Sequence, residues 1–163
     1  MMKKTLLSIL FLLSSVGVFS QDFASGFLEG RREDSNLECV SISPKMIQQI
    51  LKIEADDQND EILKIISNLK SMQILTADTG GKEYYSDALN IFNNNTDQFE
   101  TLVSHNDDAG EYYIIIKKKR SKIQELIMLV NADEKFIMID FTGKMNEKFI
   151  NRIADSVDLQ QIK

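Results

Sequence analysis

The sequence predicts an α+β fold, a two-layer sandwich in which helices cover one face of a mixed, largely antiparallel sheet. The main observation comes from the second half, where four strand-like runs at residues 99–105, 112–119, 123–131 and 136–142 are separated by short polar connections typical of hairpins. The first half instead alternates strand-like runs with apolar residues at helical spacing. We therefore expect mixed helices and strands followed by a four-strand antiparallel meander.

Helices and strands alternate through the first half of the chain. Ser43-Pro44 predicts a helix start, because serine caps free amides and proline fits the first helical position. In chain order we expect a helix at 22–29, a strand at 37–42, a helix with the buried stripe Met46, Ile47, Ile50 and Leu51, an acidic link at 54–61, a helix through Ile62, Leu63, Ile66 and Leu69, a strand at 71–77 and a helix at 82–92.

The meander ends at Gly143, and a final amphipathic helix is expected to begin near Asn146, marked by Phe149, Ile150, Ile153 and Val157. Residues 126–130 and 136–141 are apolar at nearly every position, which indicates that both faces of these strands are covered. Helices or a second subunit would supply the cover, so a homodimer through the sheet is one expectation.

The first twenty residues have the pattern of a secretory signal. Lys3 and Lys4 precede an uncharged, mostly apolar run at 6–19 that is shorter than the roughly 20 residues needed to span a bilayer as a helix. The run ends in Val18-Phe19-Ser20, which suits a peptidase site. We expect cleavage after Ser20, leaving residues 21–163 as a single α+β domain without a further transmembrane segment.

Cysteine usage bears on the compartment and on anchoring. A lipoprotein signal needs a cysteine directly after the cut, but the only cysteine is Cys39, so we expect an exported protein, periplasmic or associated with the cell envelope, that is not a lipoprotein. A lone cysteine cannot form an intramolecular disulfide. Because it lies in the strand-like run at 37–42, we interpret Cys39 as a small buried hydrophobe rather than a reactive or intermolecular thiol.

Charge and composition exclude several functions. Without Lys3 and Lys4, 17 basic residues stand against 25 acidic ones, a net charge of about −8 that disfavours nucleic acid. With one histidine and no CxxC or HExxH motif, we expect no zinc. The acidic stretch at 56–61 lacks the glycine and the final glutamate of an EF-hand loop, so we interpret it as a solvated loop. We predict no cofactor and no metal.

Two further segments invite a catalytic or phosphate-binding interpretation. His105 precedes the acidic turn at 106–108, but no nucleophile motif such as Gly-x-Ser-x-Gly completes a hydrolase triad, so a surface turn residue is the default. The segment at 79–82 (TGGK) lacks the spacing of a Walker motif and is expected to be a turn before a helix. We therefore predict no catalytic residue.

One basic run stands out against the acidic background. Lys117, Lys118, Lys119, Arg120 and Lys122 place five cations in six residues at an expected hairpin tip. Such a cluster can hold anionic lipid headgroups, a phosphorylated glycan or an acidic partner, and these five residues are the candidate anionic-surface site. The alternative is that cations at strand ends keep a hairpin soluble and block edge pairing.

The chain also resembles a known family. The resemblance lies in the leader, the strand-to-helix junction at 40–43 followed by Met46, the segment at 69–75, and the two runs at 124–128 (QELIM) and 137–143 (IMIDFTG). Together these look like the exported Bacteroidetes family catalogued as domain of unknown function 4252. The resemblance implies an envelope location in a Gram-negative bacterium and a genetic setting near extracytoplasmic-function sigma factors.

Two function hypotheses follow. The first is an exported, non-catalytic envelope protein that binds an envelope protein or an anionic surface and takes part in envelope stress signalling. The second is a small periplasmic hydrolase using carboxylate or His105 chemistry. A deep pocket with a carboxyl group of raised pKa beside His105 would favour the enzyme, whereas an exposed basic tip or a flat apolar sheet face would favour binding.

Overall fold

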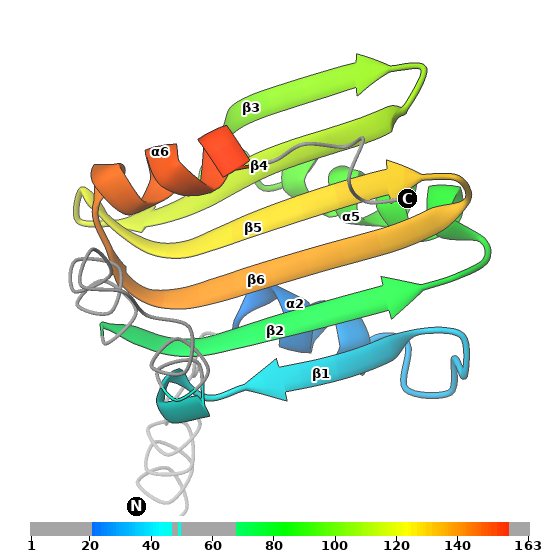
Figure 1. Ribbon diagram of the computed structural model, residues 1–163, viewed down its shortest axis with the longest axis horizontal. Helices are drawn as coiled ribbons and strands as arrows, with labels where there is room; N and C mark the ends of the chain where they lie inside the picture. The colour runs from blue at the N-terminus through cyan, green and yellow to red at the C-terminus, as the bar shows by residue number, and fades with distance from the viewer. Residues whose placement is uncertain (1–20, 47–48, 50–67, 157–163) are drawn as a thin grey trace, which may run out of the picture.

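The computed structural model describes residues 21–46, 49 and 68–156. Six strands of this part form one sheet in the order β1-β2-β6-β5-β4-β3, with every neighbouring pair antiparallel (Figure 1). The strands are β1 Glu38–Ile42, β2 Leu69–Ala77, β3 Phe99–Asp107, β4 Gly110–Lys119, β5 Lys122–Ala132 and β6 Lys135–Met145, and the helices are α2 Phe23–Glu29, α5 Gly81–Asn93 and α6 Glu147–Ser156. The predicted α+β class is confirmed, with a sheet that is antiparallel rather than mixed in this part.

The predicted meander is formed by β3, β4, β5 and β6, which are consecutive in the chain and adjacent in the sheet. Its two inner hairpins close through two-residue turns, Arg120-Ser121 and Asp133-Glu134, in which all four residues have positive φ angles of 50–65°. Turns of this kind match the right-handed twist of the flanking strands. The polar connections therefore fix the hairpins, as the sequence indicated.

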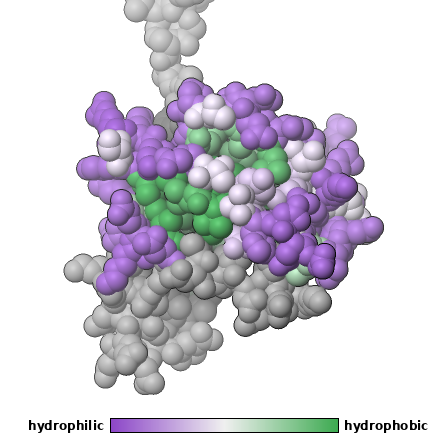
Figure 2. Space-filling model, turned by 90° about the horizontal axis from the view of Figure 1, so that it is seen from above, coloured by the Kyte–Doolittle hydropathy of each residue, from purple (hydrophilic) through white to green (hydrophobic). Residues whose placement is uncertain are grey.

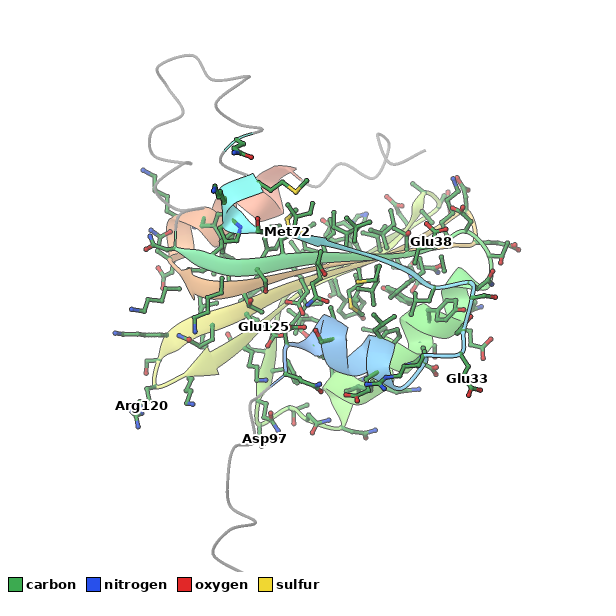
Figure 3. The ribbon with its side chains drawn as sticks, turned by 90° about the horizontal axis from the view of Figure 1, so that it is seen from below. Glu33, Glu38, Met72, Asp97, Arg120 and Glu125 are labelled. Atoms are coloured by element: carbon green, nitrogen blue, oxygen red, sulfur yellow. The ribbon has the colours of Figure 1, made fainter. Side chains whose placement is uncertain are left out.

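Helices cover both faces of the sheet. α2 and α5 pack on one face, where Phe27, Tyr84 and Phe136 belong to one buried cluster, while α6 packs on the other (Figures 1 and 3). Strand side chains alternate between the faces, so Ile127 contributes to the first cluster and Leu126 to the second. The expectation that both faces are covered is confirmed, and α6 departs from the prediction of helices on a single face because β5 and β6 are apolar on both sides.

The predicted helices at 22–29, at 82–92 and from near Asn146 are confirmed. Capping side chains explain where two of them begin, because Asp22 Oδ1 accepts a hydrogen bond from Ser25 N at 2.8 Å and Asn146 Oδ1 accepts one from Phe149 N at 2.9 Å. Leu69 was expected in a helix but is the buried first residue of β2, where it pairs with Gly143 of β6. The expectations at 1–20, at 47–48, at 50–67 and at Val157 lie outside the described residues.

The prediction that Cys39 is buried is wrong. The thiol is exposed because β1 forms an edge of the sheet, whereas α2 packs over its inner neighbours β2 and β6. Val40 on the same strand is 56% exposed, and Met46, expected in a buried stripe, is 53% exposed just after the strand ends. A strand-like apolar run therefore indicated a strand here without indicating how deeply it lies.

The face drawn in Figure 2 carries both polar and apolar residues. Seen from above, hydrophilic residues surround a smaller area of apolar ones (Figure 2). Within residues 21–46, 49 and 68–156, no helix combines the length and the apolar character that crossing a membrane requires.

Candidate functional site

Cations gather at the end of the sheet where β4 ends and β5 begins. Because the strands are antiparallel, the start of β2 and the end of β6 lie at this same end, which brings Lys70, Lys144 and the α6 residue Lys148 towards the predicted run. We call this set the basic end: Lys70, Lys117, Lys118, Lys119, Arg120, Lys122, Lys144 and Lys148. Figure 3 shows Arg120 at this end and Glu38 at the opposite one.

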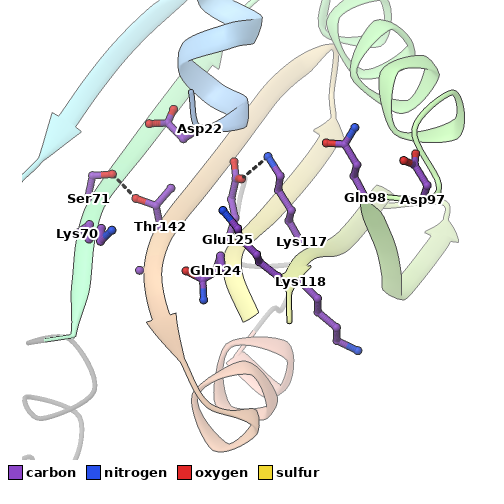
Figure 4. Close-up of a pocket in the computed structure, with 12 residues that line it drawn as sticks. Asp22, Lys70, Ser71, Asp97, Gln98, Lys117, Lys118, Gln124, Glu125 and Thr142 are labelled. Carbon is purple, nitrogen blue, oxygen red and sulfur yellow. Dashed lines mark hydrogen bonds and ion pairs between the residues drawn. The ribbon is translucent and has the colours of Figure 1, made fainter. Parts of the chain in front are cut away.

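A groove of about 680 Å³ opens at the basic end on the face that α2 covers (Figure 4). It crosses β2, β6, β5 and β4, and we call it the basic groove. Its rim carries four lysines, Lys70, Lys117, Lys118 and Lys119, and its wall includes Ser71 and Thr142, whose hydroxyl oxygens lie 2.5 Å apart. Carboxylates also line it, among them Asp22, Asp97 and Glu125. The groove thus combines cations, hydroxyl groups and acids.

A second groove, of about 660 Å³, lies at the start of α6. Its lining includes four lysines, Lys118, Lys122, Lys144 and Lys148, together with Glu147. Lys118 borders both grooves, and the Arg120-Ser121 turn lies between them in the chain. The cations of the basic end are therefore spread over several elements rather than focused on one point.

The five predicted residues are held in different ways. Lys117 is only 22% exposed, with its Nζ 3.6 Å from Glu125 Oε2 and 5.4 Å from the ring centroid of Phe99. Lys118 Nζ lies 2.7 Å from Glu100 Oε2 at the surface. Lys119, Arg120 and Lys122 are exposed around the turn. The tip thus consists mainly of the last three, while Lys117 is tied into the groove.

A pair of buried carboxyl groups, which the sequence analysis missed, lies beneath α2. Glu125 on β5 and Asp140 on β6 are 4% and 1% exposed, and they are the buried charged residues of the described part. The first amides of α2 point at them, since Phe23 N donates to Glu125 Oε1 and Ala24 N donates to Asp140 Oδ2 at 2.8 Å. A helix leaves its first amides without intrahelical acceptors, and these carboxyl groups supply two of the missing partners.

The environment of Asp140 favours its neutral form. Burial and the nearby charge of Glu125 raise the pKa of Asp140 well above its ordinary value, and the hydrogen bond from Ala24 N opposes them only in part. Among the described residues, Asp140 Oδ1 is buried and has no hydrogen-bond partner. A proton on this carboxyl group would satisfy that atom and could be donated towards Glu125.

His105 lies far from this pair. It sits exposed on the edge strand β3, where its Nε2 is 2.8 Å from Asp107 Oδ2 and its ring stacks on Tyr112. In the sheet register His105 pairs with Tyr112, whereas the β4 neighbour of Glu125 is Lys117, which pairs with Phe99 at the other end of β3. The structure therefore does not bring the histidine to the carboxyl group of raised pKa, the arrangement that would favour a hydrolase.

The TGGK segment has a structural role, and the acidic segment at 56–61 lies outside the described residues. Gly80, in the TGGK segment, has φ of 67° and caps the start of α5, so this segment is the expected turn before a helix. In the part of the chain that the structure describes, no three histidine, cysteine or acidic side chains are arranged to hold a metal ion.

The comparisons with known proteins place the chain in a family. The model of the family described as Domain of unknown function (DUF4252) matches residues 30–153, a range that contains all six strands, both grooves' lysines, Glu125 and Asp140. No curated protein matches the chain. Because the match covers most of the sequence, the chain belongs to the family Domain of unknown function (DUF4252).

Proposed function

We propose that this protein is an exported, non-catalytic module that binds an anionic phospholipid surface through its basic end. One observation carries the proposal: eight cations from β2, β4, β5, β6, α6 and the β4–β5 turn gather at one end of a chain whose formal net charge is −6. Such a separation of charge orients a protein towards a negative surface even when its overall charge is negative.

The spread of the cations favours a surface over a small anion. A single phosphate group is bound by donors that converge on one point, whereas here the lysines line two grooves and flank the turn between them. Several headgroups could therefore be contacted at once, and each lysine close to an anionic membrane contributes about 1 kcal/mol. Three exposed members of the predicted run, Lys119, Arg120 and Lys122, lie at the outermost point of this end.

Export and the absence of catalysis rest on separate observations. The leader pattern at 1–20 supports export. The buried carboxyl groups support a structural role, because one oxygen of Glu125 and one of Asp140 accept amide hydrogen bonds from α2 and neither group lies beside His105. The family resemblance implies a link to envelope stress signalling, which is separate from surface binding.

The experiment is co-sedimentation of residues 21–163 with vesicles of phosphatidylglycerol and phosphatidylcholine, compared with phosphatidylcholine alone. Replacing two exposed lysines of the basic end, Lys119→Gln with Lys122→Gln, should weaken binding by about 2 kcal/mol, or roughly 30-fold, because each lysine contributes about 1 kcal/mol. Added salt should also weaken binding, since exposed charges are screened.

The matched control removes two exposed lysines at the opposite end of the sheet, Lys82→Gln with Lys135→Gln. This control changes the net charge by the same amount but leaves the basic end intact. If binding depends on the basic end, the control should bind about as tightly as the parent. Equal losses in both double variants would show that only net charge acts, and an absence of binding to the anionic vesicles would overturn the proposal.

A further inference from the structure

Glu125 is part of both the basic groove and the buried carboxyl pair. It lines the basic groove, where its Oε2 lies 3.6 Å from Lys117 Nζ, and it is half of the buried carboxyl pair, where its Oε1 accepts the amide hydrogen of Phe23. In Figure 4 its carboxylate points towards Lys117. An anion that enters the groove would therefore approach a carboxylate that is only 4% exposed and already partnered by that lysine.

Asp140 is the group whose protonation can change when an anion enters the groove. It does not line the groove, yet it lies beside Glu125 on the next strand, with Ala24 N donating to its Oδ2 and with its Oδ1 lacking a partner among the described residues. The other groups that face it are Asp22 from the start of α2, which is acidic, and Gln73, its neutral neighbour on β2. The nearby cation Lys117 pairs with Glu125.

These contacts place an arriving anion in competition with Glu125 for Lys117. A phosphate group drawn to the lysines of the groove adds negative charge next to Glu125, and the low exposure of the pair means that little water screens the repulsion. A proton on Asp140 removes one negative charge from the cluster and supplies an O–H that can donate towards Glu125. Burial first, and then the charge of Glu125, raise the pKa of Asp140, which favours the protonated form of this group.

We propose that binding of an anionic phospholipid headgroup in the basic groove is coupled, through Glu125, to uptake of one proton by Asp140, so that the surface is bound more tightly as the pH falls. This inference rests on the proposed function and adds a regulator to the same site. By linkage, uptake of one proton per binding event increases the affinity up to about tenfold per unit decrease in pH, over the range in which Asp140 is ionised in the free protein and protonated in the complex.

The test measures binding to vesicles of phosphatidylglycerol and phosphatidylcholine from about pH 8 to about pH 5, a range in which the lysines keep their charge. All proteins carry His105→Gln, because the single histidine would otherwise titrate in the same range. The parent should bind more tightly as the pH falls. Asp140→Asn, which keeps an acceptor for Ala24 N and cannot take up a proton, should bind with little dependence on pH.

A second variant keeps the inference falsifiable if Asp140→Asn does not fold. Glu125→Gln removes the carboxylate nearest to the arriving anion, so it should bind more tightly than the parent at about pH 8 and show a flatter pH profile. Calorimetry in buffers of different ionisation enthalpy should report proton uptake by the parent and less by both variants.

The outcomes separate the two proposals. The coupling is overturned, and the surface-binding function stands, if Lys119→Gln with Lys122→Gln weakens binding but the pH profile is the same in the parent, Asp140→Asn and Glu125→Gln. An absence of binding to phosphatidylglycerol vesicles at every pH overturns the function and the coupling together.

Discussion

The two ends of the sheet share a backbone design and differ in charge. At one end the β4–β5 hairpin turns through Arg120-Ser121, and at the other the β5–β6 hairpin turns through Asp133-Glu134, with positive φ at all four residues. The second end collects acids, which we call the acidic end: Glu38, Asp78, Glu83, Asp107, Asp108, Glu111, Asp133 and Glu134. Strand twist sets the geometry of such turns. Their charge is not fixed by that geometry, which is why a segregated charge pattern points to function.

The ends also differ in how their polar groups are paired. A small cavity of about 150 Å³ near the start of α5 is closed by internal partners, because the Tyr84 hydroxyl donates to Asp34 at 2.6 Å and Arg31 pairs with Asp87 at 2.6 Å. At the basic end the grooves are larger, and Glu125, the partner of Lys117, is buried, whereas Glu100, the partner of Lys118, is exposed. Near the acidic end, Asp34 and Asp87 therefore have internal partners, while Lys119, Arg120 and Lys122 at the basic end are exposed.

The largest expected effect comes from removing the carboxylate that links the groove to α2. Glu125→Ala leaves Phe23 N–H without its acceptor and Lys117 without its carboxylate partner. Because hydrogen bonds to charged groups contribute about 1.5–3 kcal/mol, the free energy of unfolding should fall by about 2–3 kcal/mol in urea denaturation. The matched change near the acidic end, Tyr84→Phe, removes one partly buried hydrogen bond to Asp34 and should cost less. An equal loss of unfolding free energy in the two variants would contradict this difference between the ends.

A smaller effect is a pH dependence of stability that has opposite signs for Asp140 and Asp34. The raised pKa of Asp140 means that the folded state binds this proton more tightly than the unfolded state does. Its contribution to stability therefore decreases as the pH rises from the unfolded value towards the folded one, and it is largest under acidic conditions. The hydrogen bond from Tyr84 lowers the pKa of Asp34, so the contribution of Asp34 is present above the unfolded value and is lost as the pH falls through the folded one.

Thermal unfolding measured from acidic to neutral pH checks both signs. Relative to Asp140→Asn, the parent should lose stability as the pH rises, and relative to Asp34→Asn it should lose stability as the pH falls. The same sign for both comparisons would mean that the two carboxyl groups do not differ in the way their surroundings indicate.

The meander could be predicted because its information is local. The strand-like runs, the short polar connections between them and the Lys117–Lys122 run are local in the chain, and so are the helix at 82–92 and its preceding breaker. Local patterns do not specify which distant strands pair. The β2–β6 pairing, which brings Lys70 to the same end of the sheet as Lys144 and leaves β1 at the edge with Cys39 exposed, depends on contacts between residues far apart in sequence.

The buried carboxyl pair was missed for a related reason. Glu125 and Asp140 stand inside apolar strand runs, at positions in phase with the buried Ile127 and Met138, and this phase was a usable signal. A register irregularity between Ile123 and Glu125 obscures it, because these two residues are two positions apart and yet Ile123 joins the opposite cluster. The bulge could not be seen in the apolar pattern alone.

The claim that the basic end faces an anionic surface is tested most directly by labelling the two turns. With Cys39→Ser removing the native thiol, a polarity-sensitive fluorophore is attached through Ser121→Cys or through Glu134→Cys, the second residues of turns with matching φ of 63° and 65°. On vesicles containing phosphatidylglycerol and a lipid-borne quencher, the label at position 121 should be quenched and the label at 134 should not. Equal quenching at both positions, or stronger quenching at 134, would contradict the account.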